Sequence, residues 1–476
     1  MVGPKYQRPV VQTPVALKEM AGNDQWKMAT PSDALMKGKW WEMFGDPQLN
    51  QLEEMVNVNN QNVKVAEAQF REARSLIAAN RASYYPAIGS SPGITQTDPG
   101  KNRGGLGGTN QLFSLPVTAT WEPDLWGRVR LSVEGAVSNA QVSAADLENV
   151  RLSAQALLAT DYFAMSAQEM QQAVLNDTIN AYEKNLQLAT TRFSFGLASR
   201  SDITLAQTQL AGARAQRTDL NIARSNLQHA IGTLTGQTPA SLEIRAGNIN
   251  SAPPPIPMAL PSQLLERRPD IAANERLVAT ANANVGIAET AYYPTLTLSA
   301  SAGLISTNLA NLFTYASRSW SAGPSLSQTL FDFGRRGAQL EQTRAAYDAT
   351  VAAYRQTVLS AFQEVEDDLA SLRYLAEEAV QQQEAVTAAQ QALALELDRY
   401  IAGTDSYVNV ITTQTIALSD QLTAISILQR RMIAAVDLVK ALGGGWDAST
   451  LPSADQLRTT TMADPKNTQN VARARE

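Results

Sequence analysis

Two hydrophobic periods alternate along this chain, one typical of long packed helices and the other of strands with two different faces. Over 358–400 apolar residues recur at alternating steps of three and four, with two glutamine intrusions, and the pattern restarts over 408–439. A heptad pattern sustained this far predicts helices that supercoil against neighbouring helices. At about 1.5 Å per residue, a helix over 335–400 would be about 100 Å long, which is taller than an ordinary soluble domain.

Proline and glycine positions delimit these helices. Residues 124–238 and 325–451 contain no proline, the residue that most strongly breaks a helix interior. Gly196 and Gly403 interrupt the two stretches, and glycine commonly supplies the positive φ at which a helix ends. Each stretch is therefore expected to fold as a long antiparallel helical hairpin. The hairpins are predicted over 127–237, with a tip at 193–201, and over 334–445, with a tip at 400–408.

Segments with period two lie outside these helices. In 295–304, 320–327 and 113–121, apolar residues alternate with small or polar ones. The first segment has the length of about 10 residues that a tilted strand needs to cross a bilayer. Its polar face carries Ser, Thr and Gly, whereas a solvated face is usually charged. We therefore predict membrane β-hairpins over 84–126 and 291–333; an amphipathic sheet packed on a soluble core is the alternative.

A membrane location would have to depend on these strands. No run of about 20 mostly apolar residues indicates a transmembrane helix. Four strands cannot close a barrel, and an open sheet edge is not tolerated in lipid. If the strands cross a membrane, several chains must contribute to one barrel.

The two halves of the sequence match at an offset of about 207 residues, which predicts an internal tandem duplication. Three landmarks recur in the same order: Ala82-Ser83-Tyr84-Tyr85-Pro86 as Thr290-Ala291-Tyr292-Tyr293-Pro294, Trp126-Gly127-Arg128 as Phe333-Gly334-Arg335, and Arg192-Phe193-Ser194-Phe195-Gly196 as Arg399-Tyr400-Ile401-Ala402-Gly403. A period this long is not that of a solenoid.

The first β-hairpin is expected to contain a glycine-rich loop (98–110). Outside the four hairpins we expect an extended N-terminal segment with an equatorial part (1–48), a helix of the first repeat (49–83), a proline-rich linker (238–268), a helix of the second repeat (269–290) and a polar C-terminal tail (446–476).

Composition argues against most enzymatic chemistry. The 476 residues include one His and no Cys, which excludes a Cys/His zinc site and a Cys nucleophile. His229 lies in a polar helical stretch without the glycine context of a nucleophile elbow. The acidic run of Glu364, Glu366 and Asp367 is interpreted as a solvated or lumen-facing stripe rather than an active site. The net charge of -6 argues against a nucleic-acid surface. We expect no catalytic residue, no metal, no cofactor and no nucleic-acid partner.

Several motifs occur together and in one order along nearly the whole chain. They are Val2-Gly3-Pro4-Lys5-Tyr6, Trp40-Trp41-Glu42-Met43-Phe44-Gly45-Asp46-Pro47-Gln48-Leu49, Trp121-Glu122-Pro123-Asp124-Leu125-Trp126-Gly127-Arg128, Arg267-Arg268-Pro269-Asp270-Ile271, Leu330-Phe331-Asp332-Phe333-Gly334-Arg335 and Leu442-Gly443-Gly444-Gly445-Trp446. Each motif is weak alone, but the ordered set is specific. With them the chain resembles the outer-membrane efflux factor family of the TolC type, in particular its lipoprotein branch of drug and metal export systems.

The resemblance implies a mixed α and β membrane protein that forms a homotrimer. Each chain would give four strands to a twelve-stranded outer-membrane barrel, which a long periplasmic α-helical barrel continues. The implied location is the outer membrane of a Gram-negative bacterium, and no cofactor is implied. The implied partners are outer-membrane lipid, a periplasmic membrane-fusion (adaptor) protein and an inner-membrane efflux pump of the RND or major-facilitator type. The implied function is a passive duct, gated at its periplasmic helix tips, that carries drugs or other small toxic compounds to the cell exterior.

The resemblance also implies roles for the tip residues. Adaptor docking is expected at Gly196, Leu197, Ala198, Ser199, Gly403, Thr404 and Asp405. A latch that holds the resting tips closed is expected between Asp202 and Tyr400, with Arg399 as a charged partner of Asp202. A helix N-cap role for Asp202 and a solvated helix end for Arg399 remain open alternatives.

Two features depart from the family pattern. Some relatives place acidic residues inside the second tip, where this chain has Asn409 and Thr412. These two residues are expected to line the constriction without a strong block by divalent cations. Met1 stands where the lipoprotein branch has its lipidated Cys, so a lipid anchor is either missing or has been removed.

Two other functions remain open at this point. One is a soluble structural coiled-coil protein whose alternating segments form a small packed sheet, and the other is a type I secretion outer-membrane duct. Detergent dependence separates the first from a membrane duct, because a duct should need detergent and remain trimeric in it. The transported substrates cannot be read from the sequence.

Overall fold

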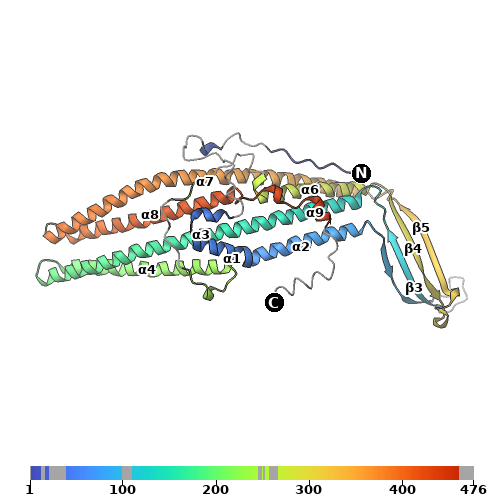
Figure 1. Cartoon of the computed structure of the whole chain (residues 1–476), viewed down its shortest axis with the longest axis horizontal. Coiled ribbons are helices and arrows are strands. Elements are labelled where there is room, and N and C mark those ends of the chain that lie inside the picture. Colours follow the sequence, from blue (N-terminus) through green and yellow to red (C-terminus); the bar gives the residue numbers. More distant parts are fainter. Residues whose placement is uncertain are drawn as a thin grey trace.

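The structure is a computed structural model that describes residues 2–11, 17–20, 39–98, 110–244, 249, 252–256 and 266–459. Most of the glycine-rich loop predicted at 98–110, part of the linker predicted at 238–268 and the end of the tail at 460–476 lie outside these residues. The chain is long and narrow, with a β-sheet at one end and helix tips at the other (Figure 1). None of the described helices has both the length and the apolar character required to span a membrane.

Two very long helices determine this shape. Helix α3 (Arg128–Ser194) has 67 residues and α7 (Arg335–Ala402) has 68. Each is therefore about 100 Å long. Each turns back at its tip into a helix of 35 residues, α4 (Arg200–Leu234) or α8 (Tyr407–Ala441), which lies beside it in Figure 1. The two hairpins begin 207 residues apart, at Arg128 and Arg335.

The helices that precede the sheet also occur twice. Helix α2 (Gln61–Ala82) and helix α6 (Pro269–Thr290) have 22 residues each. Helix α2 packs on α3, and α6 packs on both α3 and α7. The order helix, strands, long helix and short helix is thus the same in both halves, which confirms the predicted tandem duplication.

The helix predicted over 49–83 is two helices, α1 (Pro47–Asn59) and α2, with a break at Asn60. The Asn60 side-chain oxygen accepts the backbone amides two and three residues further on, at 2.9 and 3.2 Å. Its side-chain nitrogen donates to the carbonyl oxygen of Leu234 at 2.8 Å. Asn60 therefore caps the start of α2 and connects the break to the end of α4.

All strands of the described residues belong to one antiparallel sheet with the order β1-β3-β4-β5. Strand β2 also pairs with β3, so β1 and β2 are two pieces of one strand position. The sheet therefore has four strand positions. The bounds are β1 (Ala87–Ser90), β2 (Gly93–Thr97), β3 (Asn110–Trp121), β4 (Thr295–Ser306) and β5 (Arg318–Ser327).

Two prolines account for the break in the first strand position. Pro92 lies in the break, which is opposite Pro116 of β3, and neither residue has an N–H to donate to a strand ladder. On the other side of β3, Pro116 pairs with Gly303 of β4. A Cβ on Gly303 would overlap the carbonyl oxygen of Leu115 and lie 2.7 Å from Cα of Pro116. The backbones of β3 and β4 thus pass very close to each other here.

A repeated turn leads from the sheet into each long helix. Gly127 and Gly334 precede α3 and α7 with φ of 92° and 88°. Asp124 accepts two backbone amides of the first turn of α3 at 3.0 and 2.9 Å, and Asp332 accepts one in α7 at 3.2 Å. The repeated Gly-Arg landmarks therefore mark a left-handed backbone position before a helix whose first amides are capped by an aspartate.

The largest apolar core lies midway along the helical part. The 3-10 helix η3 (Trp40–Phe44) buries Trp40 and Trp41 among residues of α1, α3 and α8. Helix α9 (Ala454–Thr459) buries Leu457 in a smaller cluster with residues of α2 and α3. The described part of the segment predicted as a polar tail is therefore packed on the protein. In the described part of the chain, the other 3-10 helices are η1 (Lys18–Met20), η5 (Pro239–Ser241), η6 (Leu309–Asn311), η7 (Tyr315–Ser317) and η8 (Ala448–Thr450).

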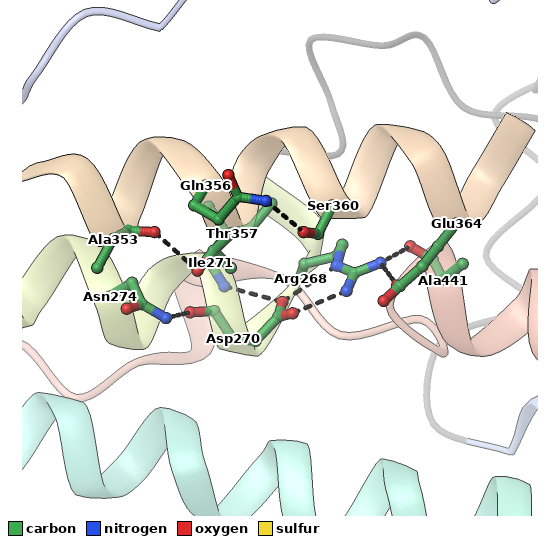
Figure 2. Close-up of polar contacts among 10 residues, drawn as sticks. All are labelled: Arg268, Asp270, Ile271, Asn274, Ala353, Gln356, Thr357, Ser360, Glu364 and Ala441. Carbon is green, nitrogen blue, oxygen red and sulfur yellow. Dashed lines mark hydrogen bonds and ion pairs between the residues drawn. The ribbon is translucent and has the colours of Figure 1, made fainter.

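Arg268 joins three helices of the second repeat just before α6 begins (Figure 2). Its guanidinium donates two hydrogen bonds to the Asp270 carboxylate, at 3.1 and 2.7 Å. It also donates to Glu364 of α7 at 2.7 Å and to the carbonyl oxygen of Ala441, the last residue of α8, at 3.0 Å. The Arg268 guanidinium is buried, and its contacts with the three groups fix the root of the second hairpin.

Candidate functional site

The first tip joins α3 to α4 through a tight turn. Gly196 has a φ of 74°, and the Leu197 amide donates to the carbonyl oxygen of Arg192 at 2.8 Å. Ser199 caps α4: the Asp202 amide donates to its hydroxyl oxygen at 3.2 Å, and the Ser199 amide donates to the Asp202 carboxylate at 3.3 Å. This is a capping box, so both side chains stabilise the start of the helix.

Apolar side chains protrude from this tip. Phe193, Phe195 and Leu197 are 44%, 75% and 67% exposed, while Ala198 is half-buried. Large exposed apolar side chains gathered at one place are typical of an interaction surface. The predicted docking residues from Gly196 to Ser199 form the turn that carries this surface.

The second tip is held by a compact polar network. Gly403 ends α7 with a φ of 78°, and the Thr404 amide donates to the carbonyl oxygen of Arg399 at 3.0 Å. The Asp405 carboxylate accepts the next backbone amide at 2.7 Å and the Asn409 side-chain amide at 2.6 Å, and it pairs with Arg399 at 3.2 Å. The backbone hydrogen bond, then Asn409 and Arg399, lower the pKa of Asp405. The carboxylate therefore stays charged and keeps this tip ordered.

A buried aromatic cluster lies between the two tips. The rings of Tyr400 and Tyr407 are 5.1 Å apart and pack with Ala206 of α4 and Val410 of α8. Burial raises the pKa of Tyr407 to about 12. Burial, followed by the nearby Asp202 carboxylate, also raises the pKa of Tyr400. Both phenols are therefore neutral at physiological pH.

The predicted latch residues lie near one another, but their predicted contacts are not formed. The Tyr400 hydroxyl is buried and has no hydrogen-bond partner among the described residues. Arg399, predicted to pair with Asp202, pairs with Glu396 at 2.9 Å and with Asp405. In this conformation Arg399 thus pairs within its own tip, and a pairing with Asp202 is not formed. Asp202 is also not the N-cap itself but the third residue of the helix that Ser199 caps.

The residues predicted to line the constriction lie on the first turns of α8, and both are exposed in the single chain. Asn409 binds Asp405, and the Thr412 hydroxyl donates to the carbonyl oxygen of Val408 at 3.0 Å. In the part of the chain that the structure describes, no three His, Cys, Asp or Glu side chains are grouped so as to hold a metal ion.

Near the tip, the buried face of α8 is shifted by one residue relative to the predicted heptad positions. Val408 and Thr415 belong to the predicted apolar series but are exposed. Tyr407, Val410 and Gln414 are buried instead. Farther from the tip the predicted series is buried, at Ile425, Met432, Val436 and Val439. The face shifts because the helix starts at Tyr407, whose ring enters the cluster with Tyr400.

One polar residue of the tips was not assigned a role from the sequence. Arg192, the repeat counterpart of Arg399, donates to the carbonyl oxygen of Ile401 at 2.8 Å, and its guanidinium carbon lies 4.8 Å from the centre of the Tyr400 ring. The offset of 207 residues marks Arg192 as equivalent to Arg399, but it does not indicate that the two side chains take different directions.

The carboxylates considered for catalysis have structural partners. Glu364 binds Arg268, and Glu366 accepts the backbone amides of Lys18 and Glu19 at 2.7 and 3.0 Å. Asp367 accepts from the Gln363 side chain of the preceding turn at 3.3 Å. The contacts of Glu364 and Glu366 connect the linker and the N-terminal segment to α7.

Comparisons with known proteins agree with this architecture. The family model described as outer membrane efflux protein matches residues 53–237 and again 260–444, which start 207 residues apart. The probable efflux pump outer membrane protein TtgC of Pseudomonas putida is 30% identical over 455 residues, which are 94% of this chain and 93% of that protein. The probable outer membrane lipoprotein SilC of Salmonella typhimurium is 28% identical over 94% of this chain and 95% of its own length.

A solved structure gives the same result for the fold. The outer-membrane channel OprN superimposes with a TM-score of 0.86 at 26% identity, over 94% of this chain and 99% of that one. The mixed α and β channel fold and the outer-membrane location predicted from the sequence are thereby confirmed. This chain belongs to the outer membrane efflux protein family, whose members are TolC-type channels with a long periplasmic helical part.

Proposed function

We propose that three copies of this chain form a passive duct through the outer membrane. One observation carries the proposal: a single sheet with free edges at β1/β2 and at β5 continues into helical hairpins about 100 Å long. A sheet with free edges is not tolerated in lipid unless the edges pair with further strands. Three copies with four strand positions each would close a barrel of twelve strands, and their hairpins would form a helical tube below it.

The proposed partners follow from the duct being passive. A periplasmic adaptor would bind the tips, and an inner-membrane pump of the RND or major-facilitator type would supply the energy. The relative TtgC is named as part of an efflux pump. We therefore propose drugs or other small toxic compounds as the cargo.

The size of the particle in detergent tests the trimer. Native mass spectrometry of the detergent-purified protein is expected to give three copies of the chain, and removal of detergent is expected to precipitate it. A monodisperse monomer that stays dissolved without detergent would contradict the trimeric duct.

Charged substitutions at the first tip are expected to prevent adaptor docking. Phe195→Asp and Leu197→Asp place a carboxylate on the exposed apolar surface, where it would lose its hydration on binding. We expect each to weaken adaptor affinity about thirtyfold, corresponding to roughly 2 kcal/mol for a central interface residue. Biolayer interferometry between purified channel and adaptor measures this loss.

Val58→Asp is the matched control for this prediction. Val58 is 68% exposed on α1, which is far from the tips, so its substitution should leave adaptor affinity unchanged. Equal weakening by all three variants would show that the tip is not the docking surface.

We further propose that the Tyr400 hydroxyl bonds to Asp202 when the tips close. In the present conformation this buried hydroxyl has no partner among the described residues, so Tyr400→Phe should not destabilise it. A closed tip would lose one hydrogen bond to a charged group, which contributes about 1.5–3 kcal/mol. Tyr400→Phe is therefore expected to raise single-channel conductance in planar bilayers by favouring open tips.

Tyr182→Phe provides the control for this measurement. Its hydroxyl is also buried without a partner among the described residues, but its ring packs with Ile179 and Leu210 inside the first hairpin. It should leave conductance unchanged. Conductance that Tyr400→Phe does not alter would eliminate the latch.

The neutral side chains of Asn409 and Thr412 are proposed to line the narrowest part of the tips. Negative charge attracts divalent cations to a constriction. The nearest carboxylate, Asp405, is already bound by Arg399 and Asn409. Addition of divalent cations should therefore reduce conductance only weakly.

A further inference from the structure

We propose that the outer end of the sheet binds an anionic, phosphate-bearing lipid of the outer leaflet, with its headgroup at Arg318 and an acyl chain in a hollow of the sheet. The proposal rests on the proposed function, because it requires one face of the sheet to lie against lipid. It assigns to the duct a ligand that is held on the outside of its wall rather than transported.

One face of the sheet is apolar across three strands. Residues that pair across an antiparallel sheet point to the same side. The pairs of β4 and β5 on this face are Leu296 with Leu326, Leu298 with Pro324, Ala300 with Ala322 and Ala302 with Trp320. The same rows continue in β3 with Trp121, Ala119 and Val117. The opposite face of β5 carries serines and a glycine, so the apolar face is the one that would contact lipid.

This apolar face is hollowed near the middle of its strands. The hollow has a volume of about 440 Å³, and its lining includes Ala119, Trp121, Leu298, Ala300, Ala322 and Pro324. Three paired alanines, one from each strand, leave space beside the larger side chains. A lipid acyl chain is apolar and flexible, and it gains van der Waals contacts by filling such a space.

One charged side chain lies at the outer end of the same face. From Ala291 to Phe331, Arg318 is the only charged residue of the sequence. It begins β5, pairs with Leu304 of β4 and shares its face with the exposed ring of Trp320. No ion pair joins Arg318 to a carboxylate of the described residues. A cation at the border of a lipid-facing surface is expected to attract an anionic headgroup.

The loop between β4 and β5 holds an aromatic ring against this guanidinium. The guanidinium carbon of Arg318 lies 4.6 Å from the centre of the Tyr315 ring. The carbonyl oxygen of Asn311 accepts the hydroxyl groups of Thr314 and Ser317, both at 2.7 Å, and thereby fixes the turn that carries the ring. The ring covers one face of the planar guanidinium. The N–H groups point outward in its plane, where they can form two parallel hydrogen bonds to a phosphate.

The position of the loop selects the outer leaflet. It lies at the end of the sheet farthest from the periplasmic helices (Figure 1). Exposed Phe313 and Tyr315 suit the interface between headgroups and acyl chains, where aromatic residues are enriched. From Arg318 to Pro324, β5 extends about 20 Å. One leaflet of a hydrocarbon core of about 30 Å is about 15 Å deep. A single lipid therefore spans the distance from Arg318 to the hollow.

Native mass spectrometry of the full-length protein in detergent measures this binding. The probes are anionic dimyristoyl phosphatidylglycerol and net-neutral dimyristoyl phosphatidylcholine, which have the same acyl chains. Binding is expected to saturate at one lipid per chain, and the anionic lipid should bind about tenfold more tightly because of hydrogen bonds to a charged group. Arg318→Gln should abolish this preference. The control Arg214→Gln removes a cation of α4 that binds Glu183, and it should retain the preference.

A second pair of variants tests the hollow. Ala322→Phe fills it and should weaken the binding of both lipids about tenfold, because fewer methylene groups are buried. Dihexanoyl phosphatidylglycerol has chains too short to reach the hollow from Arg318, so its affinity should not change. Leu326→Phe enlarges a side chain of the same strand and face outside the hollow, and it should leave the affinity for both long-chain lipids unchanged.

Three results would overturn the proposal: equal affinity of the parent for the two long-chain lipids, loss of the preference in Arg214→Gln as well, or unchanged long-chain affinity in Ala322→Phe. A fourth would assign Arg318 to a neighbouring copy instead. If Arg318 pairs with Asp98 at the end of β2 in that copy, Arg318→Gln and Asp98→Asn should lower the dissociation temperature of the trimer equally and leave lipid binding unchanged.

Conductance in a planar bilayer keeps this proposal distinct from the duct. Trimers that conduct but show no lipid preference would reject the lipid site alone. If no trimer conducts, the duct fails, while the number of lipids bound per chain and the effect of Arg318→Gln still decide the lipid site.

Discussion

Arg268→Ala is expected to loosen the root of the second hairpin by about 3 kcal/mol, since removing one partner of a buried ion pair leaves the others uncompensated. The substitution leaves the carbonyl oxygen of Ala441 without its side-chain donor, and it leaves the Asp270 carboxylate with the backbone amide of Ile271 but without a cation. Most of the loss comes from these two groups, because the Glu364 side chain is 54% exposed and can be hydrated. Figure 2 shows all three groups around the guanidinium.

Hydrogen exchange in the detergent-solubilised protein measures this effect. Amides at the end of α8 and the start of α6 should exchange about a hundredfold faster in Arg268→Ala, in proportion to the lost local stability. The neighbouring Arg267→Ala is the control, because the backbone of Arg267 lies close to Gly443 and the substitution keeps that backbone. Equal exchange in the two variants would show that the guanidinium does not secure the hairpin.

Gly303→Ala is expected to disrupt the barrel by separating β3 from β4. The added methyl group would overlap the carbonyl oxygen of Leu115, a backbone atom that cannot move without opening the strand pair. Overpacking against backbone costs roughly 3 kcal/mol, and this cost would recur in each copy of a trimer. The temperature at which trimers dissociate on semi-native gels should fall by several degrees, and the yield of trimer should decrease.

The control for this prediction is a second glycine in the same sheet. Gly323 of β5 pairs with Ser299 of β4, and a Cβ on it would have no heavy atom within 4 Å. Gly323→Ala should therefore preserve both the yield and the dissociation temperature. Loss of trimer in both variants would attribute the effect to glycine content rather than to the close approach at Gly303.

The fold was predictable where one period persists over many residues. A heptad over 358–400 specifies a helix whatever its neighbours are, and the strict alternation over 295–304 specifies a strand. Even the glutamine intrusions at 383 and 390 agree with the structure, because both positions are exposed. Because the two halves are duplicates, the clearer hydrophobic pattern of the second half also located the elements of the first half, whose pattern is weaker.

Local deviations were not predictable because they depend on side-chain contacts. The break at Asn60 follows from its bonds to two amides and to Leu234, and an asparagine within a helical pattern does not indicate these. The shift of the buried face of α8 follows from the position of Tyr407 in the tip cluster. Both are decided by tertiary packing, which overrides the local pattern.

The candidate site was predictable in position but not in connectivity. The glycines mark both tips, and Asp202, Arg399 and Tyr400 do lie there. Whether Arg399 or Arg192 crosses between the hairpins depends on rotamers, and Asp405 decides it by engaging Arg399 at 3.2 Å. The equivalent position beside Arg192 has no such acid, since Ala198 stands where Asp405 stands in the repeat.

Single-channel recording of the purified protein in a planar bilayer tests the central claim most directly. With neither adaptor, pump nor energy source present, the account predicts discrete conductance steps proportional to voltage, each produced by one particle of three chains. A bilayer that stays electrically silent after the intact trimer has inserted would contradict the duct.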